Sequence, residues 1–183
     1  MKKLFSVSLI LLSAGVLAAC GSSNSSSNSS SGKSSSAIKV RKESKTDEPS
    51  FKNNKLTLTD LDIQITQEKV IPVGQKGNEY GKKPVIAFWY KVTNKTGKEI
   101  DPSIFISLFE AVQDNDKNKV NKLNVAALPD ERFLDSQSQT IKKGGTVENA
   151  VAYDLTDETT PIKLTATVPA TGKEAGSQTY DIK

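Results

Sequence analysis

Apolar and polar residues alternate in short runs over residues 51–183, and turn-forming residues separate these runs about every ten positions. The most regular run covers 84–94. Alternation with a period of two predicts a β-strand whose side chains point to opposite faces. One face is uniformly large and apolar, and we assign it to the core: Ile86, Phe88, Tyr90 and Val92. The other face is mixed: Val85, Ala87, Trp89 and Lys91.

Similar runs predict the remaining strands, and no long segment has the 3.6-residue period of a helix. We expect strands at 56–65 (with an irregularity at Thr59–Asp60), 104–112, 123–128, 146–155, 161–168 and 178–182. A long loop is expected at 72–81. About seven to eight short strands with this spacing favour an all-β fold, an immunoglobulin-like β-sandwich. A closed barrel is the alternative topology.

The N-terminal segment has the pattern of a secretory signal. Two lysines precede an uncharged apolar stretch that ends in Leu17, Ala18, Ala19 and Cys20. This tetrapeptide resembles the lipobox of bacterial lipoproteins, so we expect a signal peptide at 1–19 and a lipid anchor on Cys20. Acylation also explains why the chain has a single cysteine. The alternative is an ordinary signal cleaved after Ala19, which leaves Cys20 as a free thiol.

Residues 20–50 are expected to form a disordered linker between the lipidated cysteine and the folded domain at 51–183. The stretch 21–36 consists of serine with a few glycine, asparagine and lysine residues, and has nothing apolar to bury. A linker of this length has a reach of roughly 30 Å. Its basic residues favour either attraction to anionic envelope material or plain solvation, because acidic residues are interleaved with them.

Charge and residue types exclude several functions. Residues 51–183 hold 18 basic and 18 acidic side chains, so the net charge of +4 belongs to the N-terminal segments. Without a basic stripe, nucleic-acid binding has no support. The chain has no histidine, which removes the commonest general base and zinc ligand. We therefore expect no enzyme activity and no cofactor.

Four segments carry a family resemblance: FKNN at 51–54, KPV at 83–85, YKVTNKT at 90–96 and KKGGTVENAVAY at 142–153. They resemble the lipoproteins of Gram-positive bacteria that carry domain of unknown function 5067, over about residues 50–170. The resemblance implies an immunoglobulin-like sandwich attached to the cell surface. It implies no catalytic residues.

Three residues are the candidates for ligand contact: Trp89, Arg132 and Phe133. Trp89 is predicted to point away from the core, where a tryptophan can anchor a binding surface. The alternative is that the Trp89 side chain is buried beneath a neighbouring segment. Arg132 and Phe133 belong to the loop at 128–135, and loops on a rigid sandwich are frequent recognition sites. Alternatively, Phe133 and Leu134 plug the open end of the sandwich.

Asp114–Asn118 matches the first half of a calcium-binding loop. The second half fails, because Lys119 stands where a glycine is needed and Val125 where a bidentate glutamate is needed. A turn is the simpler interpretation. We expect no metal site, although the sequence leaves cation binding by this segment open.

The function expected from these features is non-catalytic binding or adhesion by a lipid-anchored protein on the outer face of the cell membrane. The expected partners are the membrane itself, through Cys20, and an envelope protein, peptide or polymer. The runner-up is a solute- or metal-binding accessory lipoprotein of a transporter, which usually needs a larger cleft than one small domain offers. An enzyme with an unusual carboxylate or Ser/Lys site comes third.

Overall fold

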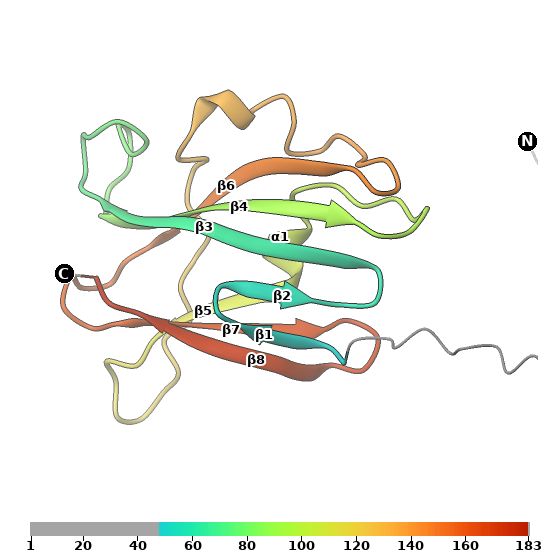
Figure 1. Ribbon diagram of the computed structural model, residues 1–183. Coiled ribbons are helices and arrows are strands. Elements are labelled where there is room, and N and C mark those ends of the chain that lie inside the picture. Colours follow the sequence, from blue (N-terminus) through green and yellow to red (C-terminus); the bar gives the residue numbers. More distant parts are fainter. Residues whose placement is uncertain (1–47, 183) are drawn as a thin grey trace, which may run out of the picture. The chain divides into compact units, whose positions relative to one another are not determined.

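Two antiparallel sheets form the fold of the computed structural model, which describes residues 48–182 (Figure 1). The larger sheet has the strand order β1 (Ser50–Lys52), β2 (Lys55–Thr57), β3 (Leu61–Ile71), β4 (Val85–Asn94) and β6 (Thr146–Asp154). The smaller sheet has the order β5 (Phe109–Gln113), β7 (Ile162–Val168) and β8 (Lys173–Tyr180). The predicted all-β sandwich is confirmed. No helix within residues 48–182 is long and apolar enough to cross a membrane.

The core lies between the sheets, and β4 supplies its centre as predicted. Ile86, Phe88, Tyr90 and Val92 are all buried and belong to one apolar cluster. The ring of Phe88 packs edge-on against Tyr180 of the opposite sheet, with 5.0 Å between ring centroids. Aromatic pairs in this geometry add to the stabilisation that burial alone provides.

The predicted strand at 56–65 is two strands. β2 ends at Thr57, β3 begins at Leu61, and the two pair with each other in antiparallel register. The irregularity expected at Thr59–Asp60 is therefore the turn between them, in which the Leu58 amide donates to the Leu61 carbonyl over 2.9 Å. β1, with three residues, was not predicted at all.

The prediction of one strand over 104–112 is wrong in its first half. Residues Ile104–Leu108 form the short helix α1, and β5 begins only at Phe109. Phe105 and Leu108, three positions apart, are buried, whereas Ile106 is 46% exposed. That spacing is helical, and Asp101 begins the turn by accepting from the Ser103 amide.

The segment 123–128 forms no strand, contrary to prediction. It makes an isolated bridge between Val125 and Tyr153 of β6. The Ala126 amide donates to the Ala152 carbonyl, and the Asp154 amide donates to the Asn124 carbonyl. The segment thus covers one end of the β6 edge. The last strand, β8, lies earlier than the predicted 178–182.

The sheets also approach each other along β1 and β8 (Figure 1). The backbone of Phe51 lies directly against Gly176, where a β-carbon would collide with it. Beside this contact, the Asn54 amide donates to the Gln178 side chain over 2.6 Å, and the Tyr180 hydroxyl donates to the Asn54 side chain over 2.8 Å. These contacts close one side of the sandwich.

Candidate functional site

The outer face of the larger sheet carries a second, small apolar cluster. It contains Ile71, Val85, Ala87 and Ala152, with Trp89 and Ala126 packed against it. Small side chains on β4 and β6 leave the Trp89 ring standing above its neighbours. Two loops flank this face: 72–84, between β3 and β4, and 123–135, which contains the 3₁₀ turn η1 (Glu131–Phe133). Figure 1 shows both beside the upper layer of the ribbon.

Asp130 connects Trp89 to the second loop. The Trp89 indole Nε1 donates to Asp130 Oδ2 over 2.9 Å. The guanidinium of Arg132 donates to the same carboxylate twice, from Nε over 2.9 Å and from Nη2 over 2.6 Å. Asp130 also caps η1 by accepting from the Arg132 amide. The Arg132 guanidinium in turn lies 5.3 Å from the centroid of the Phe133 ring.

This network keeps Asp130 ionised. Hydrogen bonds donated by Arg132 hold the pKa of the Asp130 carboxyl well below its usual range, and the Trp89 N–H acts in the same direction. Partial burial opposes this shift. The carboxylate raises the pKa of Arg132 in return, chiefly through the same hydrogen bonds. A carboxylate that is fully ionised and bidentately paired is suited to fixing a loop rather than to transferring protons.

Asn78 holds the first loop. Its side chain is buried, and Nδ2 donates to the carbonyls of Ile71 over 3.1 Å and Lys83 over 2.8 Å, which ties the two ends of the loop together. Gly77, with φ of +91°, packs directly against the Pro129 carbonyl of the other loop. A side chain at position 77 would collide with that backbone oxygen. The two loops therefore touch at this point.

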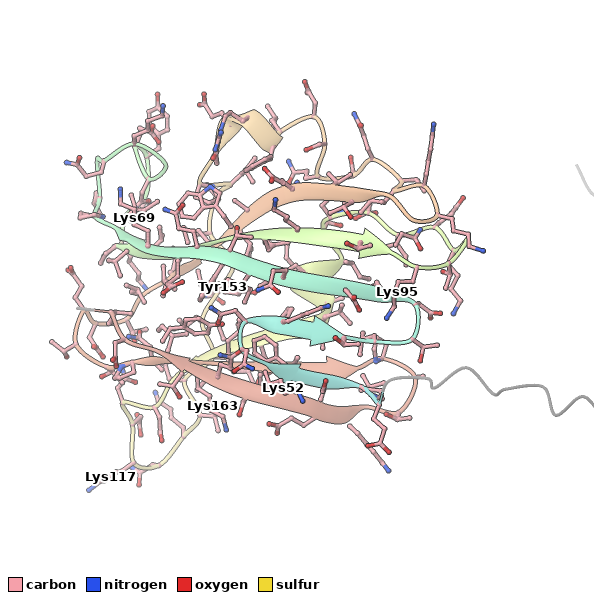
Figure 2. The ribbon with its side chains drawn as sticks, in the orientation of Figure 1. Lys52, Lys69, Lys95, Lys117, Tyr153 and Lys163 are labelled. Atoms are coloured by element: carbon pink, nitrogen blue, oxygen red, sulfur yellow. The ribbon has the colours of Figure 1, made fainter. Side chains whose placement is uncertain are left out.

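Two hollows lie on this face. The first, which we call the Trp89 cavity, has a volume of about 350 Å³. It is lined by Thr66, Gln67, Trp89, Arg132, Phe133, Glu148 and Asn149, among others. The second, the outer groove, has a volume of about 1050 Å³ and runs between residues 76–82 and 125–132. Figure 2 places Lys69, which lines the groove, at the end of β3 beside the first loop.

The three residues predicted for ligand contact meet at this site. Trp89, Arg132 and Phe133 all line the Trp89 cavity, although 41 residues separate Trp89 from Asp130, which bridges it to Arg132. Trp89 lies on the outer face as predicted and is half-buried, because the loop covers part of it. The alternative role of Leu134 as an end plug is wrong, since this side chain is 62% exposed.

Sequence reasoning missed Tyr80, Asn78 and the bridging role of Asp130. Tyr80 lines the outer groove and is 98% exposed, the most exposed large hydrophobic side chain of residues 48–182. The available signal was an aromatic residue set among glycines in a long loop, GNEYG at 77–81. Such loops are frequent recognition sites.

Asp114–Asn118 forms a turn. Asp116 accepts from the Asn118 amide over 2.9 Å and pairs with Lys119 at 3.7 Å. Asn115 binds the neighbouring loop through Thr156 and Asp157. Within residues 48–182, no group of three or more acidic or cysteine side chains could hold a metal ion. The predicted lipobox at Leu17–Cys20 and most of the predicted linker lie outside the described residues.

The model of the family described as "Domain of unknown function (DUF5067)" matches residues 36–168. The chain belongs to the DUF5067 family. The resemblance seen in the sequence is thus confirmed at the level of the family, and the match begins within the predicted linker. No curated protein matches this DUF5067 chain.

A solved structure shares the fold of this DUF5067 protein. It is the NMR structure of a protein from Enterococcus faecalis, with a TM-score of 0.55 and 23% sequence identity. The match covers 74% of this chain and 94% of that one. At this identity the likeness extends to the fold alone.

Proposed function

We propose that this DUF5067 protein is a non-catalytic binding module that uses the outer groove and the adjoining Trp89 cavity as its recognition surface. The observation that carries the proposal is the geometry of the outer groove. Its volume of about 1050 Å³ exceeds what a single small ligand fills, and an exposed tyrosine and a half-buried tryptophan lie along it. Aromatic side chains of this kind anchor many binding surfaces.

The fixed loops support the same proposal. Asn78 ties the first loop to the sheet, Asp130 ties the second to Trp89, and Gly77 joins the two loops at Pro129. A surface that is rigid before binding loses little conformational entropy when a ligand arrives.

A catalytic role is the weaker candidate. The acid nearest Trp89, Asp130, is locked in a bidentate pair with Arg132, and its lowered pKa leaves it ionised at any physiological pH. General acids and bases instead have pKa values near the working pH. The chain also lacks histidine.

The location of the module is the second half of the proposal. The apolar segment that ends in Leu17–Cys20 supports cleavage at Cys20 and acylation, which would hold the domain on the outer face of a bacterial membrane. A serine-rich linker of roughly 30 Å reach would then present the groove to the envelope and raise its local concentration there. The lipoproteins that the sequence resembles are Gram-positive.

The binding proposal is tested by photo-cross-linking on intact producing cells. A photoreactive amino acid replaces Tyr80 in the outer groove and, in a matched control, Lys163 on β7 of the other sheet, which Figure 2 places in the lower layer. We expect a covalent adduct from position 80 that position 163 does not give. Equal labelling at both positions, or none at 80, would contradict the proposal.

The anchor is tested separately. Cys20→Ser should move the protein from the membrane fraction to the medium, because the thiol that forms the thioether is gone. A Ser22→Ala variant, two residues further on, keeps the cysteine and should remain in the membrane fraction. Full membrane retention of the Cys20→Ser variant would show that the chain is not held by a lipid at this position.

A further inference from the structure

We propose that the ligand of the outer groove is a neutral polysaccharide, with one sugar ring seated over Trp89 in the Trp89 cavity and the chain continuing along the groove toward Tyr80. This inference rests on the proposed binding function and names its ligand class. Four features support it: the charge of the site, the partial cover of the sheet edges, the polar groups around the aromatic rings, and the adjacency of the two hollows.

The charges of the site cancel. The outer groove is lined by four basic side chains (Lys69, Lys76, Lys82 and Arg132) and four acidic ones (Glu79, Asp130, Glu131 and Asp154). In the Trp89 cavity, Arg132 pairs with Asp130 at 2.6 Å, and Glu148 pairs with Lys91 at 2.8 Å. A site for a polyanion such as a phosphate polymer would carry an excess of unpaired basic groups. A neutral ligand matches the charge that is present.

Part of the β6 edge is unavailable to an added peptide strand. An extended peptide that binds by strand addition needs a row of free backbone N–H and C=O groups. On β6, residues 124 and 126 occupy that row at one end, and the side chain of Asn149 accepts from the Ala150 amide further along.

The edges of β5, β1 and β8 are covered in part. On β5, the Gln113 amide donates to Asn121 and the Leu123 amide donates to Ala111. β1 and β8 lie against each other at Phe51 and Gly176. The outer groove lies over the face of the sheet and is lined by side chains, which favours a ligand that offers hydroxyl groups and ring faces over one that binds by strand addition.

The polar groups around Trp89 suit a sugar. One face of a pyranose ring is made of C–H groups that pack on an aromatic ring, and its edge carries hydroxyl groups that both donate and accept. Around Trp89, the cavity presents the side chains of Gln67, Glu148 and Arg132. Together these side chains offer both hydrogen-bond donors and acceptors to the hydroxyl groups of a sugar.

The two hollows adjoin each other, which favours a polymer that spans both over a free monosaccharide. Both are lined by Gln67, Trp89, Asp130 and Arg132. The Trp89 cavity has a volume of about 350 Å³, and the larger groove beside it is also lined by Tyr80. Two aromatic rings in one groove can each hold a different sugar unit of the same chain.

Trp89 provides the test, because it is the one tryptophan of the chain. The full chain, purified in detergent, is titrated with oligomers of N-acetylglucosamine, glucose and mannose of one to six units while Trp89 emission is recorded. Polyphosphate and a mixed peptide pool serve as comparators. We expect a saturable change in emission with at least one sugar series, and an affinity that rises with the number of units.

Two variants localise the effect. Tyr80→Ala should weaken binding of the longer oligomers about tenfold, since it removes one aromatic contact from a side chain that supports nothing in the fold. It should leave the shortest oligomers, which reach Trp89 alone, unaffected. Val120→Ala, which removes an exposed apolar side chain outside the groove, is the matched control and should bind like the unaltered protein.

The outcomes separate the two proposals. If only the peptide pool or polyphosphate changes Trp89 emission, the sugar assignment is wrong and the groove is still a binding surface. If no member of the panel changes it, the sugar assignment is also overturned, and cross-linking from position 80 then decides the binding function. If Tyr80→Ala and Val120→Ala behave alike toward long oligomers, the chain does not run along the groove.

Discussion

The two faces of β4 differ in how deeply their side chains are buried and in the contacts that they make. On the inner face, four large apolar side chains are completely buried and contact both sheets. On the outer face, Val85 and Ala87 lie in a small cluster, Trp89 is half-buried and Lys91 is exposed. The inner face therefore stabilises the fold, whereas the outer face is buried at Val85 and Ala87 and becomes accessible only at Trp89 and Lys91.

This difference indicates which part of a small sandwich can determine ligand specificity. Burial of apolar surface is non-directional and fixes the pairing of the sheets. The contacts at Trp89 are directional: an indole N–H, a carboxylate and a guanidinium join the loop to the sheet at residues 130–132. A binding surface can vary at such points without disturbing the core.

The largest effect is expected from the inner face. Phe88→Ala should lower the free energy of unfolding by about 3–5 kcal/mol, because it leaves a cavity beside Tyr153 and Tyr180. Trp89→Phe, at the adjacent position, keeps a ring but loses the bond to Asp130 and should cost about 1–2 kcal/mol. Urea denaturation measures both, and equal losses would remove the distinction between the faces.

The inner face is also what the sequence predicts best. Alternation over 84–94 correctly assigns Ile86, Phe88, Tyr90 and Val92 to the main core, but it does not reveal that Val85 and Ala87 on the other face are buried too. The same rule fails at 104–108, where IFISL satisfies both a strand pattern (104, 106, 108) and a helical pair (105, 108). Only packing against the rest of the core decides between these two patterns.

The site was predictable in part. Trp89 stands out as a large aromatic on the mixed face, and Arg132 with Phe133 stands out in a loop. Their convergence depends on the path of the 123–135 segment over the sheet, which is set by contacts such as Ala126 with Ala152. Gly77 and Pro129 meet across 52 residues of sequence for the same reason. No local pattern encodes such contacts.

The next largest effect is expected where the two loops touch. Gly77→Ala should lower the free energy of unfolding by about 2–3 kcal/mol. The alanine β-carbon would collide with the Pro129 carbonyl, and alanine would also have to adopt the unfavourable positive φ of this position. Gly74→Ala, with φ of +78° and nothing within 4 Å, should cost about 1 kcal/mol. Equal losses in thermal or urea unfolding would mean that the loops do not brace each other.

A smaller, pH-dependent effect is expected at Asp130. Its pKa lies below the ordinary value of 3.8, so its contribution to stability is complete above about pH 5 and is lost as the pH falls through the lowered pKa. Asp130→Asn should cost about 1 kcal/mol at neutral pH, and the difference from the unaltered protein should shrink below about pH 4.

The matched control for Asp130 is Asp157→Asn. Hydrogen bonds, the first of them from the Thr160 amide, also lower the pKa of Asp157, but this residue lies in the loop after β6 and has no contact with Trp89. Trp89 emission should therefore change in the Asp130 variant alone. A difference between Asp130→Asn and the unaltered protein that stays constant down to pH 2 would show that the carboxylate does not anchor the loop.

The smallest effect is expected at Lys91, the exposed residue of the outer face. Lys91→Ala removes an ion pair with Glu148 in which both side chains are about half exposed. Pairs of this kind contribute little, because water and salt screen them. The unfolding midpoint should stay within experimental error of the unaltered protein, and a clear decrease would mean that this pair supports the sheet.

The most direct measurement is amide hydrogen exchange of the full chain with and without envelope material from the producing cells. We predict slower exchange in residues 76–82 and 125–132, which wall the outer groove, and no change in β7 and β8. Slower exchange confined to β7 and β8, or no change anywhere with the domain folded, would contradict the assignment of the outer face as the binding surface.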